Sequence, residues 1–309
     1  MTSMPNQGPH KRLVDVEHRA DSMAAAVWRQ KAMPKSTEEA GQPRRFFPIA
    51  LLMATNTLKW IGTYLSHRFG SRAKFQTYEG TGDTGIYPFP DSGEWRVALA
   101  GDWASGTNEA AEVAKRIAEK EPHVSIHLGD VYYVGDEAEV RENFMGESNP
   151  DNDYDPCLWP KGSELSFALN GNHEMYARGI AYFTVMLPWL GQKASFFALE
   201  NAHWRILGLD TGYHSVGTPI LEYIFPPGCK LPDDLVAWLD AHFAPDKAAK
   251  KPTIVLTHHQ PISRFEKFFK KPGQQLAKYF DQPVLWLWGH EHWLTVYKPA
   301  TLESGLPVM

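Results

Sequence analysis

The 309-residue sequence has little cysteine and no surplus of positive charge. Its two cysteines, Cys157 and Cys229, are too few for a disulfide framework and lie in no metal-binding spacing, so unpaired thiols in a reducing compartment are expected. The formal net charge of -5 argues against a nucleic-acid groove or an anionic membrane surface as the main partner. A small anionic substrate would need cations gathered locally.

A long apolar run is also missing. The longest one follows Arg44 and Arg45 and ends at Ala54, well short of the ~20 residues that a spanning helix needs. Stable membrane insertion is therefore not expected. The first residues lack the apolar core of a signal peptide, which favours a cytoplasmic location. Twin arginines before an apolar run are also typical of a Tat export signal, so export stays open as the alternative.

The pattern of the chain changes near residue 90. Residues 1–90 are predicted to form a partly helical N-terminal extension, with helices over residues 11–33 and 48–64. Residues 91–309 are predicted to form one α/β domain, because apolar runs of strand length alternate with segments of helix length. Strands are predicted in WRVALAG, HVSIHLG, LSFALNG, SFFALE, WRILGLD, TIVLTH and VLWLWG, and helices in TNEAAEVAKRIAEK and LPDDLVAWLDAHFA.

Five polar clusters each follow a predicted strand, beginning at Asp102, Asp130, Asn172, His258 and His290. Loops at the carboxyl ends of strands in an open α/β sheet converge on one edge, so these side chains can meet in one site. Their oxygen and nitrogen donors suit Mn, Fe or Zn, and they are too many for one tetrahedral ion. A glycine precedes each of them except His258, which fits a tight exit from the strand. The sequence thus predicts two metal ions that share a carboxylate.

The clusters read GDWAS, GDVYY, GNHEMY, THH and GHEHW. This series, over residues 95–298, resembles the calcineurin-like metallophosphoesterases. Within that superfamily it looks closest to the purple or tartrate-resistant acid phosphatase type and its bacterial relatives. The resemblance implies an α/β (α+β) fold, a four-layer α/β/β/α sandwich with the metal site at the carboxyl ends of the strands.

The resemblance also implies the metal ligands. The first ion would take Asp102, Asp130, Tyr133 and His292, and the second Asp130, Asn172, His290 and one histidine of the THH pair. We favour His258 because it lies nearer the strand end, and His259 would then line the pocket. The ions would be Fe, Mn or Zn, and phenolate ligation by Tyr133 favours ferric iron at the first position.

The function implied is hydrolysis of small phosphorylated substrates, with phosphate monoesters favoured. Two ions would clamp the phosphoryl oxygens, and a shared hydroxide next to the bridging Asp130 would attack phosphorus. His173 is the candidate for protonating the leaving oxygen. His259, Arg178 and Arg264 are candidate substrate contacts, although each arginine equally fits an ordinary surface charge.

Two alternatives stay open. The same metals and ligands serve a phosphodiesterase that acts on nucleotides or lipid headgroups, because the two reactions differ only in pocket shape and leaving-group contacts. A non-catalytic scaffold of this fold is the alternative from a different class, and it should have lost ligands, whereas none is missing here. The oligomeric state is left open by the sequence.

Overall fold

The computed structural model describes residues 61–106, 108–149, 156–217, 228–245, 250–265, 267–292 and 294–309. The helix predicted over residues 11–33 and most of the one predicted over 48–64 lie outside this part of the chain; residues 61–68 are helical. No helix in the described ranges is long and apolar enough to cross a membrane. Cys157 and Cys229 are buried thiols rather than a disulfide, as the sequence predicted.

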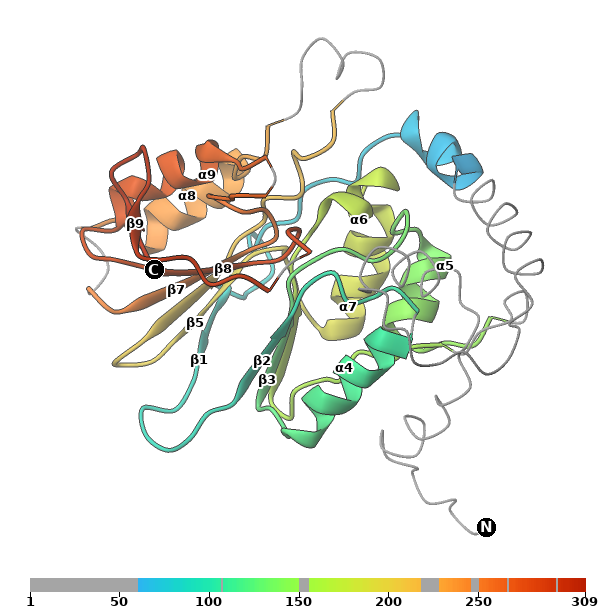
Figure 1. Ribbon diagram of the computed structural model, residues 1–309, viewed down its shortest axis with the longest axis horizontal. Coiled ribbons are helices and arrows are strands. Elements are labelled where there is room, and N and C mark those ends of the chain that lie inside the picture. Colours follow the sequence, from blue (N-terminus) through green and yellow to red (C-terminus); the bar gives the residue numbers. More distant parts are fainter. Residues whose placement is uncertain are drawn as a thin grey trace, which may run out of the picture.

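Two sheets form the centre of the molecule (Figure 1). The three-stranded sheet is parallel throughout and consists of β2 (Val97–Ala100), β3 (Val124–His127) and β4 (Leu165–Ala168). The five-stranded sheet has the order β1 (Ile86–Pro88), β5 (Phe197–Glu200), β6 (Arg205–Gly208), β7 (Thr253–Thr257) and β8 (Leu285–Trp288). Only β5 and β6, the predicted hairpin, pair antiparallel in it. Near the C-terminus, β9 (Ala300–Thr301) and β10 (Pro307–Val308) form a short antiparallel pair.

The two sheets face each other across an apolar core. Phe167 of β4 stacks on Phe197 of β5 with ring centroids 4.0 Å apart. Val124, Ile126 and Leu256 belong to the same buried cluster. All four positions of β3 are buried, as expected of a parallel strand that is covered on both faces.

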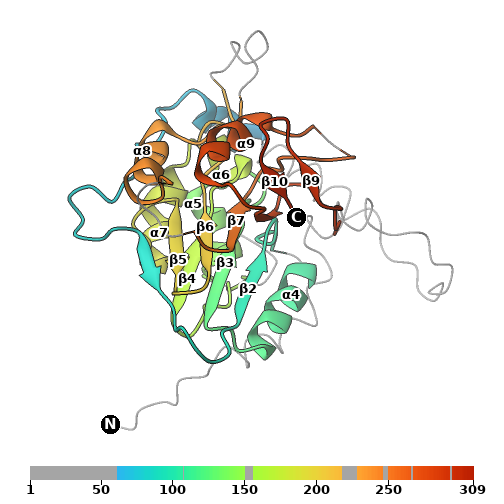
Figure 2. The same cartoon turned by 90° about the vertical axis from the view of Figure 1, so that its left-hand side faces the viewer.

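Helices cover the outer faces of both sheets. In Figures 1 and 2, α4 (Asn108–Glu119) lies next to β2 and β3, while α8 (Asp233–His242) and α9 (Lys270–Leu276) lie on the side of the five-stranded sheet. The shorter helices α5 (Glu137–Glu139), α6 (Asn172–Tyr176) and α7 (Leu187–Leu190) share the side of α4. The predicted α/β sandwich, with parallel sheets flanked by helices, is confirmed.

The sequence of α4 explains why this helix packs as it does. Its buried residues include Ala111, Ala114 and Ile117, which recur every three residues and so form one stripe of the helix, with Ala110 buried beside them. Val113, on another face, is 42% exposed. Small alanines let the helix approach the sheet closely.

The segment before residue 91 belongs to the same core. Phe75 and Tyr78 are buried in the main apolar cluster, and the Tyr78 hydroxyl donates to the Phe196 carbonyl at 2.5 Å. Further along, β1 pairs in parallel with β5. The segment just before residue 91 therefore packs into the same core, and β1 is an edge strand of the five-stranded sheet.

Candidate metal centre

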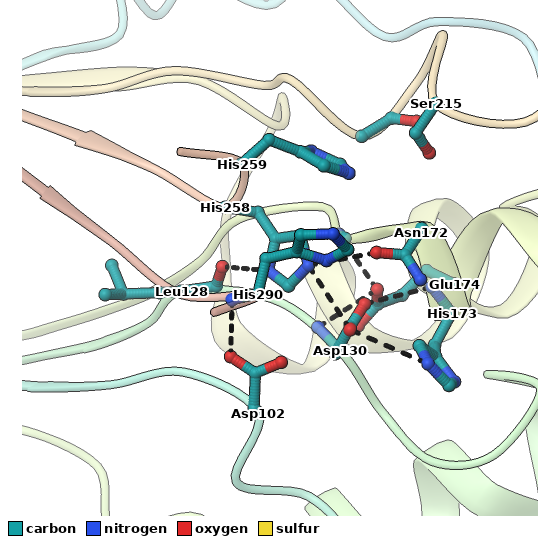
Figure 3. Close-up of polar contacts among 12 residues, drawn as sticks. Asp102, Leu128, Asp130, Asn172, His173, Glu174, Ser215, His258, His259 and His290 are labelled. Atoms are coloured by element: carbon teal, nitrogen blue, oxygen red, sulfur yellow. Dashed lines mark hydrogen bonds and ion pairs between the residues drawn. The ribbon is translucent and has the colours of Figure 1, made fainter. Parts of the chain in front are cut away.

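Five strand ends meet at one edge of the two sheets (Figure 3). Asp102 follows β2 and Asp130 follows β3, Asn172 opens α6 after β4, and His258 and His290 follow β7 and β8. Ligand atoms of Asp102, Asp130 and His258 all lie within 4.8 Å of one another. The same holds for His258 with His259 and His290. Residues far apart in sequence thus form two overlapping groups of donors that share His258.

The backbone is strained where it delivers these side chains. Asp102, Asp130 and His290 have φ angles of 55°, 72° and 63°, in the left-handed region that L-residues rarely adopt. A Cβ atom added to Gly171 would lie 2.1 Å from Asp130 Oδ1, and one added to Gly289 would lie 2.8 Å from Asp102 Oδ2. The glycines therefore permit the close approach of backbone and carboxylates that the sequence predicted.

His258 is fixed by a backbone carbonyl. Its Nδ1–H donates to the carbonyl of Leu128 at 2.9 Å, so its Nε2 faces the site. That nitrogen lies 3.2 Å from Asp130 Oδ2 and 3.2 Å from Asn172 Oδ1. Burial would lower the pKa of His258, but the charge and contact of Asp130 raise it to about 9. A ring nitrogen held in this way by a carbonyl is typical of metal-ligating histidines.

The other two histidines of this group lie beside His258. His259 Nδ1 is 3.0 Å from the Thr211 hydroxyl, and its ring centroid is 4.7 Å from that of His290. Burial, with the positive charge of His258 next, holds the pKa of His259 well below its usual value and lowers that of His290 to about 4. Both imidazoles are therefore neutral and able to act as ligands near pH 7.

Asp130 lies between the two groups and is 1% exposed. Burial would raise the pKa of Asp130, but His258 and His173 hold it well below its usual value. The His173 amide donates to Asp130 Oδ1 at 2.9 Å, and His173 Nε2 lies 3.8 Å from Asp130 Oδ2. The His173 Nδ1–H donates to the carbonyl of Tyr133 at 2.6 Å, which orients its ring toward the site.

A tyrosine joins Asp102 and His292. The hydroxyl of Tyr132 donates to Asp102 Oδ1 at 2.9 Å and lies 2.8 Å from His292 Nε2, which is itself 3.1 Å from Asp102 Oδ1. The sequence motif points to the next residue, Tyr133, at this place. Its amide instead donates to Glu139 at 2.7 Å, and burial followed by the charge of Glu139 raises the pKa of its phenol. The motif spacing assigns no role to Tyr132, whose hydroxyl lies between Asp102 and His292.

Glu174 is a second residue to which the sequence analysis assigned no role. Its buried carboxylate accepts from the amides of Asp130, Val131 and Gly171 at 3.2, 2.9 and 2.9 Å. Burial, with the charge of Asp130 next, raises its pKa to about 8. Glu174 ties the loop after β3 to the start of α6, and it occupies the last position of the GNHE motif, which is the signal that could have identified it.

The two arginines predicted to contact the substrate differ in their surroundings. Arg178 Nε donates to the carbonyl of Gly70 at 3.0 Å, and its own carbonyl accepts from the amide of Ala73 at 2.9 Å. This side chain fastens the N-terminal segment to the turn after α6. Arg264 is exposed, and its amide contacts the Tyr297 hydroxyl at 3.3 Å.

The donors fit two metal ions. The Asp130 side chain is 1% exposed and the Asp102 side chain 12%, and within the described ranges their ion pairs are all with histidines. Carboxylate, amide and imidazole donors suit hard or borderline metals. Buried carboxylates that face imidazoles, which can give up a proton to a bound ion, rather than lysine or arginine, leave a place where a metal cation can balance their charge.

Comparison with known proteins gives one result. A family model described as calcineurin-like phosphoesterase matches residues 95–294. The matched range is more than half of the chain and contains all five strand ends. No curated protein matches the chain.

Proposed function

Because the chain belongs to the calcineurin-like phosphoesterase family, we propose that it hydrolyses phosphate monoesters with two metal ions held at the carboxyl ends of its strands. The observation that carries the proposal is the meeting of Asp102, Asp130, Asn172, His258 and His290 at one edge of the sheets. Metal-dependent hydrolysis of phosphoric esters follows from the family and this donor set. The preference for monoesters is the finer part of the proposal.

We propose that Asp130 would serve both ions, since its Oδ2 lies 3.2 Å from His258 Nε2 and its carboxylate has a ligand atom within 4.8 Å of one of Asp102. The second ion would take Asn172, His258 and His290 besides Asp130. The contacts of His258 Nε2 with both Asp130 and Asn172 support it over His259.

The first ion would take Asp102, Asp130, His292 and a tyrosine. The family pattern selects Tyr133, whereas the contacts favour Tyr132, whose hydroxyl lies between Asp102 and His292. We propose Tyr132 as the phenol of this position. A phenol here also supports the likeness to purple acid phosphatases, and it favours ferric iron over manganese or zinc.

When bound, two such ions supply an activated water and balance the negative charge that develops on the phosphoryl oxygens. The chain positions the other groups. His173 would donate a proton to the leaving oxygen from Nε2, because its Nδ1–H is committed to the Tyr133 carbonyl. His259, held by Thr211, would line the pocket beside His290.

The test is hydrolysis of an aryl phosphate monoester and the matching diester. Protein stripped by a chelator should be inactive and should regain turnover with iron, manganese or zinc. We expect the monoester to be cleaved faster; a faster diester would replace the phosphatase with a phosphodiesterase. Folded protein that turns over neither ester with any of these metals would instead support a non-catalytic scaffold.

A further inference from the structure

A basic cavity lies beside the metal centre. It measures about 390 Å³, and its charged lining consists of Arg72, His214, Lys230 and Lys271, which we call the basic pocket. Among the lining residues that the structure describes, none is a carboxylate. Three permanent cations around one cavity are unexpected in a chain whose net charge is -5, so this is a local concentration of positive charge of the kind that attracts anions.

The walls of the basic pocket hold Arg72 in place. Its Nη2 donates to the carbonyl of Val216 at 2.7 Å, and its guanidinium lies 5.1 Å from the centre of the Tyr213 ring. The Tyr213 hydroxyl in turn donates to the carbonyl of Ala73 at 2.9 Å. Next to it, Arg68 donates to the carbonyl of Gly217 at 2.8 Å. Neutral backbone carbonyls hold the Arg72 guanidinium in place without cancelling its positive charge.

The charge of Lys230 is only weakly compensated. Lys230 Nζ lies 3.1 Å from Asp233 Oδ1, but the Asp233 side chain is 88% exposed, and such a surface pair contributes little. Burial, followed by the charges of Lys230 and Arg72, lowers the pKa of His214 to about 4. The neutral imidazole is thus a further sign of the positive field in the cavity.

One loop connects the basic pocket to the metal centre. Thr211 contacts His259, and a Cβ atom on Gly212 would lie 2.3 Å from the Asn170 carbonyl, so the loop starts against the site. His214 follows Thr211 by three residues, a span of at most about 11 Å. In Figure 3, Ser215 lies on the same side of the site as His259 and Asn172.

From the charge, the walls and this proximity, we propose that the basic pocket binds a second anionic group of the substrate, a phosphate or a carboxylate. The inference rests on the proposed function and deepens it. The preferred substrates are then phosphoesters whose alcohol carries another anionic group, and simple alkyl phosphates are poor substrates. A free phosphate ion shares the chemistry, but the loop that joins the pocket to the site favours a group attached to the substrate.

The test compares phosphate release from alkane-α,ω-diol bisphosphates of three to eight carbons with that from alkyl monophosphates of the same lengths. At the best length, we expect kcat/KM for the bisphosphate to exceed that for the monophosphate about a hundredfold, since each charged contact is worth roughly tenfold. Lys230→Ala combined with Lys271→Ala should bring this ratio close to one. Lys270→Ala is the matched control, because Lys270 neighbours Lys271 in α9 but pairs with Glu303 at 2.6 Å outside the pocket, and it should keep the ratio.

A second measurement separates this inference from the proposed function. The best bisphosphate is titrated by calorimetry into chelator-treated protein, where the metal centre takes no part. Binding that the double variant weakens about a hundredfold supports the pocket even if no ester is hydrolysed. Equal affinity in wild type and double variant overturns the pocket. Equal kcat/KM for the best bisphosphate and the alkyl monophosphate, in a protein whose metal-free form binds inorganic phosphate through these lysines, overturns the substrate subsite in favour of a free anion.

Discussion

The two ends of the strands in the central sheets differ in how their acidic side chains are paired. At the edge away from the metal centre, where β6 and β7 begin, Glu200 accepts from Arg205 at 3.0 Å and also pairs with Lys251. Lys250 and Asp281 form another pair there. At the carboxyl ends of the strands, Asp102 and Asp130 face histidines instead.

This difference indicates where the protein is expected to bind a cation from solution. Acids at the far edge are neutralised by the chain's own cations and lie close to solvent. Acids at the site edge are more deeply buried and lie on backbone with φ angles of 55° and 72°. Strain and uncompensated charge persist only where the surroundings hold them in place, and they cluster at functional sites. The two edges therefore serve as test and control for each other.

The largest expected effect follows from removing the shared carboxylate. Asp130→Asn should lower kcat/KM on the order of a thousandfold or more, because two-ion catalysis contributes several kcal/mol and both ions lose a ligand. Metal content by mass spectrometry should fall with it. Glu200→Gln, at the far edge, is the control and should leave both unchanged. An Asp130→Asn protein with full metal content and turnover would remove the metal centre from this edge.

The tyrosine pair gives the next largest effect. Tyr132→Phe should weaken binding of the first ion about a hundredfold, because it deletes the hydroxyl between Asp102 and His292. If that ion is ferric iron, as proposed, the visible charge-transfer band of the iron-loaded protein should be lost as well. Tyr133→Phe is matched in chemistry and should keep the band. Calorimetric iron binding and absorption spectra measure both effects. The reverse result would assign the ligand to Tyr133, as the motif spacing predicts.

Substitution of Glu174 should lower metal affinity by a smaller factor, because Glu174 positions the loop that carries Asp130. Glu174→Gln removes one of the acceptor oxygens for three backbone amides, so we expect metal affinity to fall about 10- to 100-fold. Thermal unfolding shows whether the variant is still folded at the temperature of the titration. Wild-type affinity in a folded variant would limit Glu174 to a role in folding.

The smallest expected effect is on stability, from a substitution at the strand ends far from the metal centre. Glu200→Gln should cost less than about 1 kcal/mol of unfolding free energy at pH 7. Burial would raise the pKa of Glu200, but Arg205 and Lys251 lower it below 4.5, so the ionised group stabilises the fold above that pH. This contribution is lost as pH falls through the lowered pKa. Urea titrations of both proteins should therefore differ at pH 7 and converge below the lowered pKa of Glu200.

Much of the fold could be predicted because its signals are local. Every predicted strand from WRVALAG to VLWLWG is found, and so are α4 and α8. Parallel strands with crossover helices bring their carboxyl ends together, so the sequence alone predicts that Asp102 and His290 lie in one site. In contrast, β1 was not predicted, because three residues carry too little periodicity and its pairing with β5 is a long-range contact.

The sequence by itself determined the sheets, the order of the strand ends and the residue types at the metal centre, because apolar periodicity and strand-end glycines are properties of neighbouring residues. Only the tertiary structure decided which hydroxyl of the Tyr132 and Tyr133 pair meets Asp102, and that Glu174 holds the loop of Asp130. It also gathered Arg72, His214, Lys230 and Lys271 around one cavity. Each of these depends on side-chain direction and on contacts between distant segments, and neither is set by the spacing of residues along the chain.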